Sequence, residues 1–125
     1  MPKTVLIVED NALDMRLFDD LLTEHGYNVI KTGNGGDVVE FARDYRPDLI
    51  LIDIQLPGIS GLDALELLRR DPETRKIPAI AVTAFAMKGN REMFLDLGFD
   101  DYISKPISVP RYLRTVAGSL NGGAD

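Results

Sequence analysis

The fold class is decided by one central segment of the sequence, Leu49-Ile50-Leu51-Ile52-Asp53-Ile54-Gln55-Leu56-Pro57-Gly58. Consecutive branched apolar residues without alternation are typical of a short strand buried on both faces of a parallel sheet. This run ends at Asp53, and a Pro-Gly turn follows. A carboxylate in this position lies at the carboxyl edge of the sheet, where open α/β folds bind ligands. Because an unpaired buried charge is costly, Asp53 is expected to have partners elsewhere in the chain.

Other short apolar runs alternate with helical patterns on either side of this segment. They predict strands at residues 5–8, 27–30, 79–82 and 102–103. In the first helical segment, the residues expected to face the sheet are Leu13, Leu17, Phe18, Leu21 and Leu22. Strands that alternate with helices form parallel sheets with right-handed crossovers and helices on both faces. The chain is therefore predicted to be an α/β protein with a flavodoxin-like, doubly wound (βα)5 fold, a five-stranded parallel sheet with five helices.

Length and composition indicate a single domain. The 125 residues, 1–125, are predicted to form a stand-alone domain without an output domain. A net charge of −6 argues against a surface for nucleic acid or anionic membranes, because such surfaces need a basic excess. The absence of cysteine excludes disulfides and thiolate chemistry. There is no leader pattern and no apolar run near ~18 residues, so we expect a cytoplasmic protein without membrane insertion.

Polar side chains follow four of the five predicted strands. They are Glu9 and Asp10 after the first strand, Asp53 after the third, Thr83 after the fourth and Lys105 after the fifth. The carboxyl ends of parallel strands share one edge of the sheet, so these side chains are expected to converge. Two like charges about 4 Å apart repel by roughly 4 kcal/mol at an effective dielectric of about 20. A hard divalent cation would neutralise the excess of acid, and Mg²⁺ suits carboxylates, a backbone carbonyl and waters.

Each of these residues, taken singly, also has an ordinary structural explanation. An acid after a strand often caps a turn or a helix, Lys105 can be a solvated loop residue, and Thr83 can belong to the core. Their matching positions at strand ends favour a functional site, in which an ammonium group, a hydroxyl donor and a metal surround one carboxylate. The segment Gly33-Asn34-Gly35-Gly36 is rejected as a phosphate-binding loop, because it follows the second strand and Val38 replaces the third glycine of that motif.

Several segments resemble the receiver domain of two-component response regulators. They are Val5-Leu6-Ile7-Val8-Glu9-Asp10-Asn11, Asp53-Ile54-Gln55-Leu56-Pro57, Val82-Thr83-Ala84 and Lys105-Pro106. The likeness extends through the whole chain in the same order. Residues 55–61 and 83–89 are more narrowly similar to the single-domain cell-division regulators of the DivK type.

This resemblance implies a phosphoryl-accepting site. Asp53 would take a phosphoryl group from a phosphohistidine of a sensor histidine kinase or of a histidine phosphotransfer protein. The Mg²⁺ ion would be held by Asp10, Asp53 and the carbonyl of Gln55, with Glu9 acting through water. The protein would then be a signalling phosphoacceptor with self-catalysed transfer, and not a turnover enzyme.

The same resemblance implies a switch. Lys105 would bind one phosphoryl oxygen, and Thr83 would move to bond another. Tyr102 matches the switch aromatic of the family, which turns inward once Thr83 has moved; the alternative is an ordinary edge-strand tyrosine. Phe85, two residues after Thr83, is apolar and would not orient a hydrolytic water, which predicts slow autodephosphorylation. The peptide bond before Pro106 is expected to be cis.

Without an output domain, the signal is expected to leave through a surface for a separate downstream protein. Residues predicted to lie on partner surfaces are Met15, Met87, Lys88, Pro106 and Arg111. The expected role is control of the cell cycle or cell division, and the alternative is a general phosphorelay shuttle of a different pathway. We expect a monomer or a weak homodimer.

Three other classes compete with this interpretation. A phosphatase of the haloacid dehalogenase type also uses an aspartate nucleophile, but it needs a second acid two residues later, where Gln55 stands. A flavin-binding carrier shares the fold, but the acidic edge would repel the flavin phosphate. A degenerate receiver that acts only as a scaffold is disfavoured, because all five site residues are present.

Overall fold

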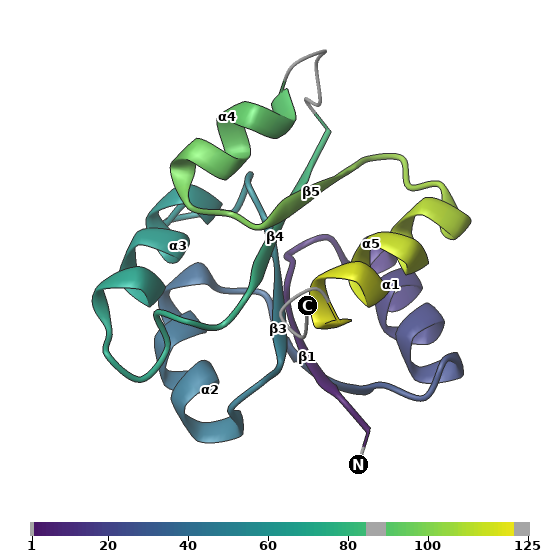
Figure 1. Ribbon diagram of the computed structural model, residues 1–125, viewed down its shortest axis with the longest axis horizontal. Helices are drawn as coiled ribbons and strands as arrows, with labels where there is room; N and C mark the ends of the chain where they lie inside the picture. Colours follow the sequence, from purple (N-terminus) through teal and green to yellow (C-terminus); the bar gives the residue numbers. More distant parts are fainter. Residues whose placement is uncertain (1, 85–89, 122–125) are drawn as a thin grey trace.

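The computed structural model describes residues 2–84 and 90–121. Its single sheet has five parallel strands in the order β2-β1-β3-β4-β5 (Figure 1). The strands are β1 (Thr4–Val8), β2 (Asn28–Thr32), β3 (Leu49–Asp53), β4 (Ala79–Thr83) and β5 (Asp101–Ser104). The helices are α1 (Ala12–Glu24), α2 (Val38–Tyr45), α3 (Gly61–Arg70), α4 (Asn90–Leu97) and α5 (Val109–Asn121), with a short 3-10 helix, η1 (Gly35–Asp37). The predicted five-stranded parallel fold is confirmed.

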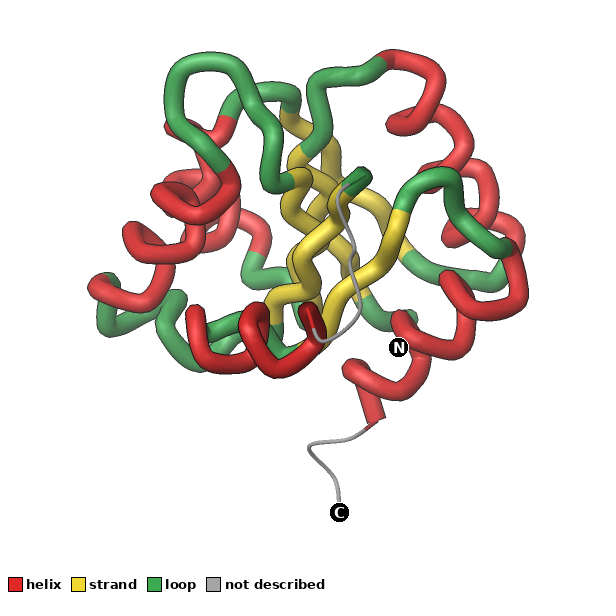
Figure 2. Tube along the Cα trace, turned by 90° about the horizontal axis from the view of Figure 1, so that it is seen from above, coloured by secondary structure: helices red, strands yellow, loops and turns green. Residues whose placement is uncertain are grey.

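Successive residues of the central strands face two separate cores. Leu49 and Leu51 of β3 point to the core under α1 and α5, whereas Ile50 and Ile52 point to the core under α2, α3 and α4. Figure 2 shows the yellow strands flanked by red helices on both sides. Both faces of the sheet are therefore buried, which explains why the strand sequences are continuous apolar runs without alternation.

Helix α1 buries only part of the face predicted from the sequence. Leu13 and Leu17, expected to face the sheet, are 80% and 40% exposed. The inward face is formed by Phe18 and Leu22, which are buried, and by Met15, which is half-buried against the same core. The prediction is therefore confirmed for Phe18, Leu21 and Leu22. It was wrong for Leu13 and Leu17, because helical spacing alone fits either these residues or Met15 to the inward face.

One buried tyrosine fixes α1 against α5. The ring of Tyr112 is fully buried and stacks on Phe18, with 5.2 Å between ring centroids. Its hydroxyl group donates a hydrogen bond of 3.2 Å to the backbone carbonyl of Phe18. A buried hydroxyl without a partner would be costly, so this bond stabilises one arrangement of α1 and α5.

Two of the helices that follow strands begin at a polar side chain that caps them. Asn11 caps α1, and its side-chain oxygen accepts a hydrogen bond from the amide of Asp14 at 2.9 Å. Ser60 caps α3 in the same way, with the amide of Asp63 at 3.2 Å. The Lys105–Pro106 peptide bond is cis, as predicted. Within the described part of the chain, no helix combines the length and apolar character needed to cross a membrane.

Candidate phosphoryl-accepting site

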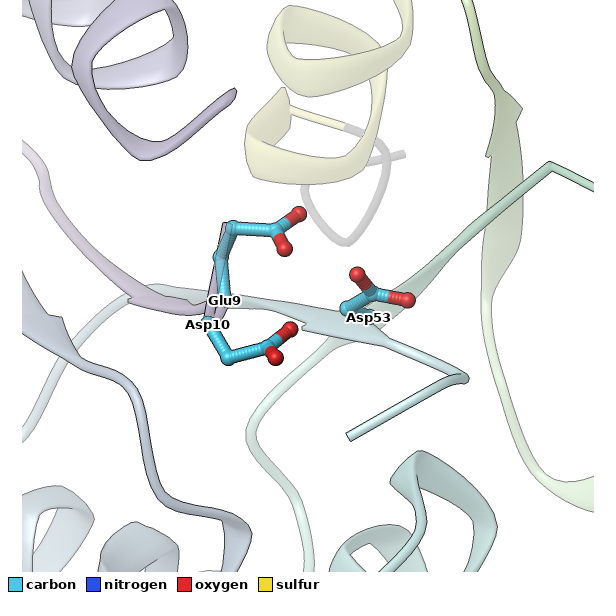
Figure 3. A group of neighbouring side chains, drawn as sticks. All are labelled: Glu9, Asp10 and Asp53. Atoms are coloured by element: carbon cyan, nitrogen blue, oxygen red, sulfur yellow. The ribbon is translucent and has the colours of Figure 1, made fainter. Parts of the chain in front are cut away.

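Four strand ends bring the predicted polar residues to one edge of the sheet. Asp53 is the last residue of β3 and is 5% exposed. It is paired in register with Val82, the neighbour of Thr83 at the end of β4. Figure 3 shows the carboxylates of Glu9, Asp10 and Asp53 gathered at this edge. The convergence predicted from the order of strands and helices is therefore present.

Asp53 has fixed partners on both carboxylate oxygens. Its Oδ1 accepts a hydrogen bond of 2.8 Å from the backbone amide of Gln55, and its Oδ2 accepts one of 2.9 Å from Nζ of Lys105. The donor at Gln55 is the backbone amide, and the residue itself is exposed. These two bonds hold the orientation of a buried carboxylate that would otherwise be free to rotate.

Lys105 contacts two further carboxylates besides Asp53. Its Nζ lies 2.8 Å from Oε1 of Glu9 and 2.9 Å from Oδ2 of Asp14. The Glu9 contact is an ion pair without the directed geometry of a hydrogen bond. Burial lowers the pKa of Lys105, but the contacts with the three carboxylates outweigh this effect, so its pKa is raised. Lys105 is therefore held as a cation.

Asp14 is a site residue that the sequence analysis missed. It lies in the first turn of α1. The other site residues were predicted because they follow strand ends, and Asp14 does not. A signal was present, because the Asn11 cap starts α1 directly after β1 and so keeps the first helical turn close to the same edge of the sheet.

Glu9 is the most strongly perturbed acid in the cluster. Burial raises its pKa to about 7, and the adjacent Asp53 carboxylate adds to the rise. Lys105 and the amide of Asn11, which donates to Oε2 at 3.1 Å, act in the opposite direction without cancelling it. Mainly because it is buried, the carboxyl group of Glu9 therefore keeps its proton well above its ordinary pKa of 4.5.

Three carboxylates have the arrangement of a candidate metal centre. Glu9, Asp10 and Asp53 each offer an oxygen, and these oxygens all lie within 4.8 Å of one another. Asp10 is exposed, whereas the other two are buried. Oxygen ligands with one side open to water suit Mg²⁺, which keeps part of its hydration shell when proteins bind it. The residues present fit the predicted ion.

The two predicted switch residues are buried or partly buried. Thr83 ends β4 and is 2% exposed. Tyr102 of β5 is half-buried, and its ring stacks on Phe94 of α4 with 5.6 Å between centroids. This ring pair packs β5 against α4. The inward turn of Tyr102 on activation stays a prediction.

The residues predicted for partner surfaces lie in different environments. Pro106 and Arg111 are exposed, but Met15 is half-buried, as described above. Met87 and Lys88 lie outside the described residues, as does Phe85. On α1, Leu13 is far more accessible than Met15.

The chain belongs to the response regulator receiver domain family, whose family model matches residues 5–117. It is 56% identical over 120 residues to the polar-differentiation response regulator DivK of Brucella anthropi, and the match covers 96% of this chain and 98% of that protein. The protein of the same name from Brucella ovis is 53% identical with the same coverage. The predicted resemblance, to the family and to its DivK type, is confirmed.

Solved structures agree with this assignment. The receiver domain of a sensor histidine kinase from Pseudomonas aeruginosa PAO1, with a magnesium ion coordinated in its active site cleft, is 32% identical with a TM-score of 0.87; the match covers 97% of this chain and 99% of that chain. A response regulator from Chloroflexus aurantiacus is 27% identical with a TM-score of 0.89, over 96% and 98% of the two chains. The chain is therefore a response regulator receiver domain.

Proposed function

We propose that Asp53 accepts a phosphoryl group from the phosphohistidine of a sensor histidine kinase or a histidine phosphotransfer protein. The observation that carries this proposal is a buried carboxylate at the end of β3, fixed by the Gln55 amide and by Lys105. A carboxylate oxygen of Asp53 attacks phosphorus, and the P–N bond breaks. Its electron pair stays on the imidazole nitrogen, which then takes up a proton from solvent. No acid on this protein is needed to protonate the leaving group.

Other residues of the site bind and orient the reacting groups. Mg²⁺ would be held by Asp10, Asp53 and the backbone carbonyl of Gln55, with Glu9 acting through water. When bound, the ion would offset negative charge on the phosphoryl oxygens. Lys105 donates to one of these oxygens, and the hydroxyl group of Thr83 donates to another. Loss of the adduct is slow, because the apolar Phe85 does not orient a water for hydrolysis, so the protein is a phosphoacceptor and not a turnover enzyme.

Treatment with acetyl phosphate and Mg²⁺ tests this function by intact mass spectrometry. The parent protein should gain one phosphoryl group, and Asp53→Asn should gain none. Asp63→Asn, a change at an exposed aspartate in the first turn of α3, should be labelled like the parent. Steady release of phosphate without a lasting adduct would instead indicate a phosphatase, and an unmodified parent would indicate a scaffold.

The likeness to polar-differentiation regulators supports a role in cell-cycle or cell-division control. In this proposal the phosphorylated domain acts in the cytoplasm, as a monomer or weak homodimer, on a separate downstream protein. The stacked pair Phe94 and Tyr102 joins β5 to α4, and the proposed output surface includes α4 and β5 together with the exposed Arg111 of α5. A general phosphorelay shuttle is the alternative role.

The phosphodonor is proposed to dock on the start of α1, beside the site. Leu13 is 80% exposed there, and Leu17, one turn later, is 40% exposed. Leu13→Ser should slow labelling by a histidine phosphotransfer protein that phosphorylates the parent, by about fivefold, as expected for a lost apolar contact of roughly 1 kcal/mol. The slowing with acetyl phosphate should be much smaller. Tyr45→Ser, at an exposed aromatic of α2, is the matched control, and equal slowing with both donors would contradict the docking role.

A further inference from the structure

The ammonium group of Lys105 lies among three carboxylates, donates a hydrogen bond to Asp53 and forms ion pairs with the other two. A lysine carries three N–H donors, and three carboxylate oxygens lie within 2.9 Å of Nζ. They belong to Glu9, Asp14 and Asp53. A phosphoryl oxygen that binds Lys105 must therefore compete with these three carboxylates for the ammonium group.

The three carboxylates differ in how readily water could solvate them after the contact with Lys105 is lost. The side chains of Glu9 and Asp53 are 1% and 6% exposed, whereas that of Asp14 is 34% exposed. An ionised carboxylate that loses its partner in a buried position is strongly destabilised, but an exposed one is solvated at little cost. Release of Asp14 is therefore the least costly way to open a position beside Nζ of Lys105.

We propose that Asp14 is a positioning residue that competes with the phosphoryl group for Lys105. This inference rests on the proposed function of Asp53. In the resting protein Asp14 forms an ion pair with Lys105, and it leaves when the phosphoryl group arrives. With acetyl phosphate, Asp53 forms the new O–P bond, the old O–P bond breaks, and acetate leaves with the electron pair. Asp14 gives up its ion pair with Lys105 and transfers no proton.

The exchange changes the surface of α1 as well as the site. The amide of Asp14 stays bound to the Asn11 cap at 2.9 Å, so the helix start does not depend on the side-chain contact. The released carboxylate then faces water next to Leu13, the most exposed large apolar residue on this helix. Phosphorylation is thus expected to add an unpaired negative charge to the surface proposed to bind the phosphodonor, which favours release of a spent donor.

The test compares Asp14→Asn with the parent in two titrations followed by amide resonances. With saturating Mg²⁺, beryllofluoride should bind Asp14→Asn about two- to fivefold more tightly, the range expected for one partly exposed ion pair. Labelling by acetyl phosphate should accelerate by a similar factor. With Mg²⁺ alone, the variant should bind equally or more weakly, because a negative charge near the site has been removed. Asp20→Asn removes the same charge from an exposed position on α1, paired with Arg16 at 3.8 Å, and should change neither titration.

The outcomes separate this inference from the function on which it rests. If the parent protein binds no beryllofluoride and takes no label, the proposed function fails. If the parent responds and Asp14→Asn responds equally or more weakly, Asp14 does not compete for Lys105 and the inference is overturned while the function stands. Opposite changes in the two titrations support competition, because a residue needed only for structure would weaken both.

Discussion

Replacement of Gly61 by alanine is expected to destabilise the protein by about 3 kcal/mol, the upper end for overpacking against well-packed surroundings. A methyl group at this position would overlap the carbonyl oxygen of Asp53 and would lie 2.7 Å from Cα of Ile54. These atoms are backbone and cannot rotate away as a side chain would. The amide of Gly61 also donates to the carbonyl of Ile54 at 3.0 Å, which holds α3 against the end of β3. The melting temperature should fall by roughly 10 °C.

Differential scanning calorimetry on Gly61→Ala and Gly118→Ala would check this prediction. Gly118 lies in α5, and a methyl group there would meet nothing within 4 Å. Alanine should leave stability unchanged at Gly118 or raise it by up to about 1 kcal/mol, from helix propensity. A Gly61→Ala protein that melts within about 1 °C of the parent would show that the β3–α3 loop yields easily. The rate of labelling by acetyl phosphate should also fall, because Asp53 would move with its own backbone.

The order of elements could be predicted because both faces of the sheet are buried. The β3 residues 49–52 alternate between two cores, so the strand sequence has no polar face, and this pattern is distinctive. The topology then fixes the strand ends at one edge of the sheet. Glu9, Asp10, Asp53 and Lys105 could be found in this way, since their positions depend only on where the strands stop.

Side chains on helices could not be assigned with the same certainty. In α1, Leu13 and Leu17 repeat with helical spacing just as Met15, Phe18 and Leu22 do, and only tertiary packing decides which set is buried. The stacking of Phe18 on Tyr112 of α5 makes that decision, through a contact between residues 94 positions apart. Asp14 was missed for a related reason, because its role depends on the rotation of α1 about its axis.

The metal-free protein is expected to lose stability as the pH rises from about 4.5 to about 7. Glu9 keeps its proton in the folded state up to about pH 7, mainly because it is buried, whereas the unfolded chain releases it near the ordinary value of 4.5. The folded state therefore binds more protons in this window, so stability falls with rising pH by at most about 3 kcal/mol and then levels off.

Other shifted groups act outside this window. The pKa of Asp71 is lowered by its pairing with Arg43, and the pKa of Asp19 is lowered by Lys31, so both affect stability only in more acidic solution. The raised pKa of Lys105 matters only in strongly alkaline solution. A decline between pH 5 and 7 can therefore be attributed to the acid cluster.

Urea unfolding in EDTA at pH 5 and pH 8 would measure this decline. Glu9→Gln should remove most of the difference, because glutamine does not ionise, and Glu24→Gln, at an exposed position of α1, should leave it unchanged. Mg²⁺ at pH 8 should restore stability to the parent, since a divalent cation favours the ionised carboxylates of Glu9, Asp10 and Asp53. Equal stability of the parent at the two pH values in EDTA would mean that Lys105 already neutralises the cluster. Binding of Mg²⁺ would then not relieve any repulsion among the carboxylates of Glu9, Asp10 and Asp53.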